Sequence, residues 1–322
     1  MKTQSILILA FIFVIVGGCS NRDDQNIPGN KEKVIVQLDW VPEPEHGGLY
    51  QALAKGYFAD AGLDVTLLPG GANIAVIESV AVGQADVGQS ASTQVITAAS
   101  RDLPIKNIAS VFHQIPTALM LHEDNPIDSF SELDKKTIMA RPEALYIPFI
   151  KEKYGIDFDV IPQNFGLGML INDPKFIQEG FYIAEPFFAE KEGVKLKFLR
   201  LSEAGYEVYA TLFANDNFLE SRPEVAAAFV DAFIKGWADY LEGDPTPAHE
   251  AIKAARNGEV DDDFLNFSRE MIITENLGRG NPKKNETYGS INKSRLANEI
   301  KMLEALGAIE SGSVSVEEIL YE

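Results

Sequence analysis

One stretch of the chain, residues 38–65, constrains the fold more than any other. It reads LDWVPEPEHGGLYQALAKGYFADAGLDV. This pattern predicts a buried strand, a loop marked by Pro and Gly, a helix and the start of a second strand. Such a unit is typical of a sheet with crossover helices. Ligands bind open α/β sheets at the carboxyl ends of the strands, so we expect a site at this loop.

The loop carries side chains suited to recognition. Trp40 supplies an aromatic ring, Glu43 and Glu45 supply carboxylates, and His46 supplies an imidazole. Trp40 is expected to stack on a ligand, with core packing as the alternative. His46 either contacts the ligand or caps the helix. Of the two glutamates that flank Pro44, one is expected to face solvent. No nucleophile or metal accompanies these carboxylates, which favours binding over catalysis.

Beyond residue 33 the chain alternates short β-rich runs with helical stretches, which predicts an α/β fold with largely parallel sheets. The alternation restarts after Pro116. We expect two α/β lobes around a cleft, the first from residues 34–115 and 210–322 and the second from 116–209. Crossings near Pro116 and Gly205 would act as hinges for closure on a small molecule. The expected strands are 34–38, 64–68, 86–88, 105–112, 117–121, 136–140, 181–184 and 206–214, and the expected helices are 47–61, 73–84, 90–100 and 146–154, with a mostly helical region from 223 onward.

The N-terminus has the pattern of a lipoprotein signal peptide, residues 1–18. Lys2 precedes an apolar run too short to span a bilayer. Small residues then stand directly before Cys19, the only cysteine. This arrangement resembles a bacterial lipobox and implies lipidation of Cys19; a plain secretory signal with an incidental cysteine is the alternative. Residues 19–33 are polar and predict a tether. We therefore expect a protein anchored to a bacterial membrane, facing the periplasm or the cell exterior.

Charge and composition exclude several other roles. The net charge of -20 argues against nucleic acid, whose phosphates require a basic surface. Lipidation of Cys19 would leave no free thiol for covalent chemistry. His249 has no partner at metal-ligand spacing. We expect no metal, no other cofactor and a monomeric chain.

Several segments together resemble the NMT/SsuA-type family of periplasmic-binding-protein-like folds. Besides 38–65, the matching segments include VGQADVGQSAS, FSELDKKTIMA, FYIAEPFFAEKEG and RPEVAAAFVDAFIKGWADYL. The resemblance implies the type II periplasmic binding protein fold, with two α/β lobes, a ligand cleft and two hinge crossings. Members include ABC-transporter binding proteins for alkanesulfonates, nitrate, taurine and thiamine-pyrimidine precursors, and also the eukaryotic thiamine pyrimidine synthases.

The resemblance also implies positions for the site. The loop from Trp40 to His46 corresponds to a wall of the cleft, and the turn and helix start near residues 71 and 90 correspond to donors of N–H and O–H groups. Glu185 matches a glutamate that accepts hydrogen bonds from an amino group in pyrimidine-binding relatives. The loop with Arg141 departs from the Gly- and Ser-rich pattern of relatives, so Arg141 would add a charge. The expected ligand-binding residues are Trp40, Glu43, His46, Tyr50, Gly71, Ser90, Ser92, Arg141, Tyr146 and Glu185.

These features predict an extracytoplasmic solute-binding lipoprotein of an ABC importer, which captures a small pyrimidine-like molecule, such as a thiamine precursor, for a permease and its ATPase. The enzyme alternative is the pyrimidine synthase. The resemblance implies that a synthase needs a lysine for pyridoxal phosphate, a histidine four residues later and a cysteine cluster tied to iron. The matching positions here are Ser90 and Gln94, so we expect no catalytic residue. A ligand-sensing module for a signalling partner is the third alternative.

Overall fold

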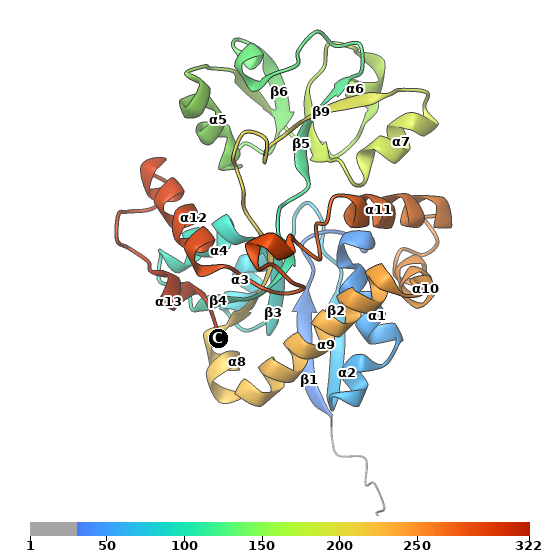
Figure 1. Cartoon of the computed structure of the whole chain (residues 1–322), viewed down its shortest axis with the longest axis vertical. Coiled ribbons are helices and arrows are strands. Elements are labelled where there is room, and N and C mark those ends of the chain that lie inside the picture. The colour runs from blue at the N-terminus through green and yellow to red at the C-terminus, as the bar shows by residue number, and fades with distance from the viewer. Residues whose placement is uncertain (1–30) are drawn as a thin grey trace, which may run out of the picture. The chain divides into compact units, whose positions relative to one another are not determined.

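The computed structural model describes residues 31–322. The predicted signal peptide, Cys19 and most of the predicted tether lie outside the described residues. Within residues 31–322, no helix combines the length and the apolar character that crossing a bilayer requires. The described chain forms two five-stranded sheets with helices around them, and each sheet is the centre of one lobe (Figure 1).

The first sheet has the strand order β2-β1-β3-β10-β4. β1 is parallel to β2 and β3, whereas β10 is antiparallel to β3 and β4. The carboxyl ends of β1 and β3 therefore lie at one edge, where the loop with Trp40 follows β1 and helix α4 follows β3. The strands are β1 (Glu32–Gln37), β2 (Leu63–Leu68), β3 (Val87–Ala91), β4 (Ile105–Phe112) and β10 (Ala210–Asn215).

The second sheet repeats this plan with the order β7-β6-β8-β5-β9. β6 is parallel to β7 and β8, whereas β5 is antiparallel to β8 and β9. Both sheets are therefore mixed, and the expectation of largely parallel sheets is wrong. In each sheet the reversed strand is the one that follows a crossing between lobes, β5 after the first and β10 after the second. The strands are β5 (Thr117–His122), β6 (Thr137–Ala140), β7 (Asp159–Pro162), β8 (Gln178–Phe181) and β9 (Leu196–Arg200).

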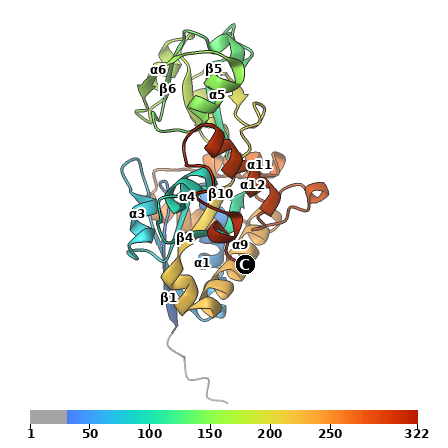
Figure 2. The same cartoon turned by 90° about the vertical axis from the view of Figure 1, so that its left-hand side faces the viewer.

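The helices cover both sheets and extend the first lobe. The C-terminal helices return to the first lobe, where α9 packs on α1 and α12 packs on α4 (Figures 1 and 2). The helices are η1 (Pro44–His46), α1 (Gly47–Ala54), α2 (Tyr57–Asp60), α3 (Val76–Ala81), α4 (Ser92–Ala99), η2 (Phe130–Leu133), α5 (Tyr146–Tyr154), α6 (Gly168–Asn172), α7 (Glu185–Lys191), α8 (Asp216–Ser221), α9 (Pro223–Glu242), α10 (Thr246–Ala255), α11 (Asp262–Thr274), η3 (Pro282–Lys284), α12 (Lys293–Ala305) and α13 (Val316–Ile319).

Close packing of α1 against α9 sets the position of the loop that precedes α1. A Cβ on Gly48 would lie 2.5 Å from the Trp237 ring, and one on Gly236 would lie 2.2 Å from the carbonyl oxygen of Gly48. Trp237 and Tyr240 are buried in the core of the first lobe. The second lobe has a separate hydrophobic core. Each lobe thus has a hydrophobic core of its own.

Three of the expected elements are wrong in part. The expected helix 47–61 is two helices, because Gly56 adopts a φ of 76° between α1 and α2. The expected strand 181–184 is the end of β8 followed by a turn, in which Ala184 N donates to Phe181 O at 3.0 Å. The expected strand 206–214 begins only at Ala210, since the preceding residues form the second crossing. Strands β7 and β9 were not expected.

Candidate functional site

The loop after β1 is fixed by close backbone contact with the segment after β2. Gly70 N donates to Trp40 O at 2.9 Å, and Leu38 N donates to Leu68 O at 3.0 Å. A Cβ on Gly70 would lie 2.3 Å from Leu38 O and 2.5 Å from Trp40 N. Because these atoms belong to the backbone, no side-chain movement could make room. Gly70 therefore determines where the half-buried Trp40 stands.

His46 braces this loop from the inside. Its side chain is fully buried, and Nδ1 accepts a hydrogen bond from Glu43 N at 3.3 Å. A ring nitrogen that accepts carries no proton, so Nε2 carries it and donates to Asp39 Oδ1 at 3.0 Å. Both nitrogens of His46 thus hold the loop together, which corresponds to the structural alternative for this residue.

Asp39, Glu45 and His46 are the group that could surround a metal ion within residues 31–322, with ligand atoms within 4.8 Å of one another. His46 Nε2 lies 3.7 Å from Glu45 Oε1. A metal-binding imidazole normally donates its other N–H to an acceptor. Here the other nitrogen accepts from a backbone N–H, so Nε2 keeps its proton and has no lone pair for a metal. The geometry favours a hydrogen-bonded cluster.

Glu43 and Glu45 both point inward, so the expectation that one faces solvent is wrong. Glu43 pairs with Arg256 at 3.0 Å; burial raises the pKa of Glu43, and the Arg256 guanidinium opposes this. The Glu45 side chain is 6% exposed, and its Oε1 has no hydrogen-bond partner among residues 31–322. Burial, followed by the charges of Asp39, Glu43 and Glu185, raises the pKa of Glu45 well above its ordinary value.

Arg141 and Tyr146 meet on a carboxylate of the second lobe that the sequence did not reveal. Glu179, on β8, accepts from Arg141 N at 2.9 Å, from Arg141 Nε at 2.8 Å and from Tyr146 O–H at 2.9 Å. Burial and the Glu179 charge raise the pKa of Tyr146 well above its ordinary value. The positive charge of Arg141 is therefore neutralised by Glu179 of the same lobe. A glutamate in a short strand gives no sequence signal for such a role.

Glu185 stands at the start of α7, and its carboxylate accepts a hydrogen bond from Phe181 N at 2.9 Å. Burial raises the pKa of Glu185 to about 7, although the backbone hydrogen bonds oppose this, and the charges of Glu43 and Glu179 add to the rise. Glu43 belongs to the first lobe and Glu179 to the second. The Glu185 carboxylate therefore lies within electrostatic reach of both walls.

The two predicted serines form contacts within the first lobe. Ser90 lies near the end of β3, so the expected helix start at 90 is wrong, and Ser92 is the first residue of α4. Ser90 Oγ donates to Gln94 Oε1 at 2.5 Å. Ser92 Oγ accepts from Tyr209 N at 3.0 Å and donates to Glu299 Oε2. Burial raises the pKa of Glu299 to about 8. These contacts join α4, α12 and the second crossing (Figure 2), and they leave the serine hydroxyls occupied.

Two other predicted residues, Tyr50 and Gly71, lie in the core and in a loop of the first lobe. Tyr50 is 4% exposed in the core of the first lobe, where burial raises its pKa to about 12. Gly71 lies in the loop after β2 with a φ of 153°, next to the Gly70 that supports Trp40. Tyr50 is thus a packing residue of the wall, and Gly71 belongs to its outer loop.

An aromatic contact joins the two lobes. The rings of Trp40 and Phe165 are 5.0 Å apart and tilted by 40°. Phe165 is 46% exposed and adopts a φ of 60°, which costs free energy for a bulky side chain. Hydrogen bonds of 2.9 Å hold its loop, from Gly166 N to Asn164 Oδ1 and from Gln178 Nε2 to Gly166 O. The second lobe thus presents Phe165 to Trp40.

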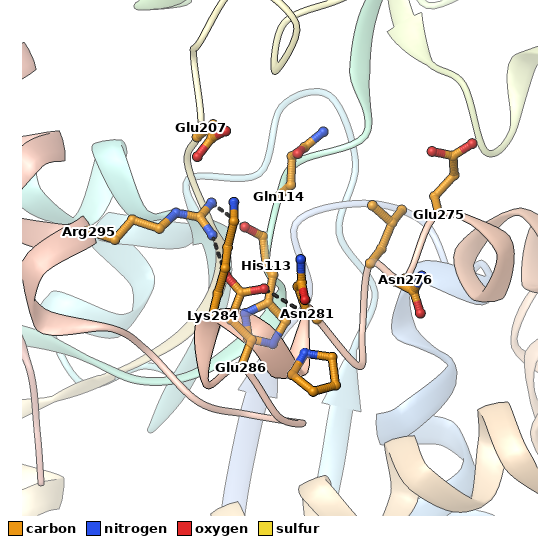
Figure 3. A pocket seen from close by; sticks show the side chains of 12 residues that line it. His113, Gln114, Glu207, Glu275, Asn276, Asn281, Lys284, Glu286 and Arg295 are labelled. Atoms are coloured by element: carbon orange, nitrogen blue, oxygen red, sulfur yellow. Dashed lines mark hydrogen bonds and ion pairs between the residues drawn. The ribbon is translucent and has the colours of Figure 1, made fainter.

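A cavity of about 370 Å³ lies at the crossings, and no predicted ligand-binding residue lines it (Figure 3). His113 of the first crossing and Glu207 of the second contribute to it. Arg295 donates to His113 O and pairs with Glu286 at 3.4 Å. His113 Nε2 is also 2.9 Å from Thr287 O. These contacts bind the C-terminal segment to the first crossing, so the cavity belongs to the hinge.

A family model, NMT1/THI5 like, matches residues 43–248. The chain belongs to the NMT1/THI5-like family. The match begins at Glu43, in the loop after β1, and ends in α10. It confirms the resemblance inferred from the sequence segments.

Individual NMT1/THI5-like relatives include both binding proteins and enzymes. The formylaminopyrimidine-binding protein of Halalkalibacterium halodurans is 29% identical over 255 residues, which cover 75% of this chain and 76% of that protein. A 4-amino-5-hydroxymethyl-2-methylpyrimidine phosphate synthase of Saccharomyces cerevisiae is 26% identical over 247 residues, with coverages of 67% and 69%.

Solved structures confirm the predicted fold class. The aliphatic sulphonate binding protein SsuA of Escherichia coli superimposes with a TM-score of 0.67 at 9% identity, covering 90% of this chain and 92% of SsuA. The nitrate-binding protein NrtA of Synechocystis gives 0.60 at 14% identity, with coverages of 90% and 86%. The NMT1/THI5-like chain therefore has the periplasmic binding protein fold, and its similarity to binding proteins supports a binding role.

Proposed function

We propose that this protein is the extracytoplasmic solute-binding component of an ABC importer and captures a small, pyrimidine-like molecule by lobe closure. The observation that carries this proposal is that the loop after β1 holds both the half-buried Trp40 and the buried carboxyl group of Glu45, on which the Glu185 charge of the second lobe also acts. A flat ring can stack on Trp40, while the carboxylates accept its N–H groups. Sulfonate or nitrate would instead require several donors and little negative charge.

The proposal places the protein on a membrane through lipid on Cys19, as a monomer that delivers its ligand to a permease and its ATPase. The formylaminopyrimidine-binding relative supports a thiamine-precursor-like ligand. If Cys19 is the anchor, Cys19→Ser expressed in a bacterial host should move the protein from the membrane fraction to the soluble fraction. Mass spectrometry of the N-terminal peptide should then show loss of a diacylglycerol adduct.

A thermal-shift screen of pyrimidines, thiamine precursors, flavins, sulfonates and polyamines tests the ligand class. We expect pyrimidines to raise the melting temperature. Trp40→Ala and Glu185→Gln should abolish the shift. Glu190→Gln, which changes an exposed glutamate of the same helix α7, should preserve it. A flat screen with folded protein would contradict the proposal.

The enzyme alternative draws support from the synthase relatives. At the positions that match the synthase lysine and histidine, this chain has Ser90 and Gln94, which hydrogen-bond to each other. Neither side chain can form an imine with pyridoxal phosphate or supply an imidazole. The purified protein incubated with pyridoxal phosphate should therefore show no yellow, borohydride-reducible adduct. A stable adduct would favour the synthase.

A further inference from the structure

Buried carboxylates in the cleft differ in whether a cation neutralises them. Glu43 is paired with Arg256, and Glu179 is paired with Arg141. Among residues 31–322, Glu45 and Glu185 form no ion pair with any lysine or arginine. Glu45 does have His46 in ion-pair range. The Nε2 proton of His46, however, is directed to Asp39 and not to Glu45. The described residues therefore leave two carboxyl groups without a cation, the buried Glu45 and the half-buried Glu185.

Glu45 is the less satisfied of these two carboxyl groups, because its Oε1 is buried without a hydrogen-bond partner in the described chain. Burying such a group costs free energy that no contact within the protein recovers. Natural proteins retain such costs mainly at functional sites. Glu45 is the middle residue of η1 and lies close enough to Glu185 for the two charges to repel.

We infer that Glu45 is a ligand-binding residue and that, together with Glu185, it makes the cleft selective for a ligand bearing a protonated amino group. This inference rests on the proposed function and specifies its ligand. An ammonium group placed between the two carboxyl groups supplies the missing positive charge and the N–H donors. A neutral hydroxyl in the same place supplies one donor and no charge.

Ligand binding is then coupled to proton release. Burial and the surrounding acids keep Glu45 protonated to a higher pH than an ordinary glutamate, since its pKa is raised well above that range. A cation favours the carboxylate, so binding expels the proton to solvent, and affinity rises with pH until the unliganded carboxyl is ionised. Helix α11 packs against η1, but its first acids are exposed. The charges that act on Glu45 are those of Asp39, Glu43 and Glu185, and His46 lies in ion-pair range. Arg256 pairs with Glu43, and Asp262 and Asp263 are the exposed acids at the start of α11.

Isothermal titration calorimetry with two pyrimidines of matched size tests this selectivity. The probes are 4-amino-5-aminomethyl-2-methylpyrimidine, whose side chain is an ammonium at pH 7.5, and its neutral 5-hydroxymethyl counterpart. We expect the aminomethyl probe to bind at least tenfold more tightly and to release protons in buffers of different ionisation enthalpy. Glu45→Gln should reduce the preference to below threefold. Glu190→Gln should keep it.

The outcomes separate this inference from the proposed function. Equal or tighter binding of the hydroxymethyl probe, or a preference that survives Glu45→Gln, keeps the pyrimidine-binding function and overturns the cation inference. If neither probe binds, the proposed function fails, and the cation inference is then tested on the stability of the protein without ligand. Glu45→Gln should then raise the melting temperature at pH 8 and change it less at pH 5. A lower melting temperature at pH 8 would assign Glu45 a structural role and overturn the inference.

Discussion

Glu45 of the first lobe and Glu179 of the second are the same residue type at nearly the same burial, with side chains 6% and 5% exposed. Their surroundings are opposite. Glu179 accepts hydrogen bonds from Arg141 and Tyr146, whereas Glu45 Oε1 has no such partner within residues 31–322. Burial alone therefore does not distinguish a structural acid from a recognition acid. The distinction lies in whether the protein itself satisfies the carboxylate.

The comparison predicts opposite stability effects in the two lobes, and the largest is at Glu179. Glu179→Ala removes the acceptor of a buried ion pair and of a buried tyrosine hydroxyl, so we expect a loss of about 3 kcal/mol in the free energy of unfolding. Arg141 is 38% exposed and can regain water, which keeps the loss moderate. Urea denaturation measures the change, with Glu190→Ala as the exposed control. If Glu179→Ala lowers the free energy of unfolding no more than Glu190→Ala does, Glu179 does not differ from Glu45 as a structural acid.

A second prediction concerns how rigidly the first-lobe wall is held. In Gly70→Ala the new Cβ would meet backbone atoms of Leu38 and Trp40, so the loop after β1 must shift. We expect a loss of about 1–3 kcal/mol together with weaker ligand binding. Gly62→Ala is the matched control, since Gly62 has a φ of 79° but open space around its Cβ, and it should lose stability without affecting binding. Unchanged affinity in Gly70→Ala would show that the wall does not depend on this contact.

Much of the fold could be predicted from local sequence patterns. The difference between the paired Glu179 and the unpaired Glu45 could not. The strand–loop–helix pattern at 38–65 and the restart after Pro116 predicted two α/β lobes, because strands and helices impose different periods on the chain. The place of Trp40 in a loop at a strand end could be predicted from the same pattern, and Glu185 was chosen from the family resemblance; the binding role of both stays a prediction. Glu179, Glu299 and Phe165 could not be predicted, since their roles arise from contacts between segments far apart in sequence. The pairing of Glu43 with Arg256, likewise, joins residues 213 positions apart.

A third buried acid, Glu299, extends the comparison to the effect of pH on stability. Burial raises the pKa of Glu299 to about 8, so the folded state retains a proton that the unfolded chain releases near pH 4.5. The unfolded state then binds fewer protons, and the free energy of unfolding falls as pH rises from about 4.5 to 8. Glu299→Gln should flatten this fall by at least about 1 kcal/mol, measured by urea denaturation at pH 5, 6.5 and 8. Equal slopes in both proteins would mean that Glu299 ionises like an exposed acid.

The smallest effect is expected where the two walls touch through Trp40 and Phe165. An aromatic pair contributes about 0.5–1.5 kcal/mol beyond its buried area, and Phe165 lies at the exposed rim. The chain has two tryptophans, and Trp237 is buried in the core, so Trp40 reports on this contact by fluorescence. Phe165→Ala should shift the emission to the red and increase acrylamide quenching, whereas Met169→Ala, equally exposed on the neighbouring helix, should change neither. An unchanged Trp40 signal in Phe165→Ala would show that the second lobe does not shield Trp40 in solution. The two lobes would then be apart at this contact until a ligand brings them together.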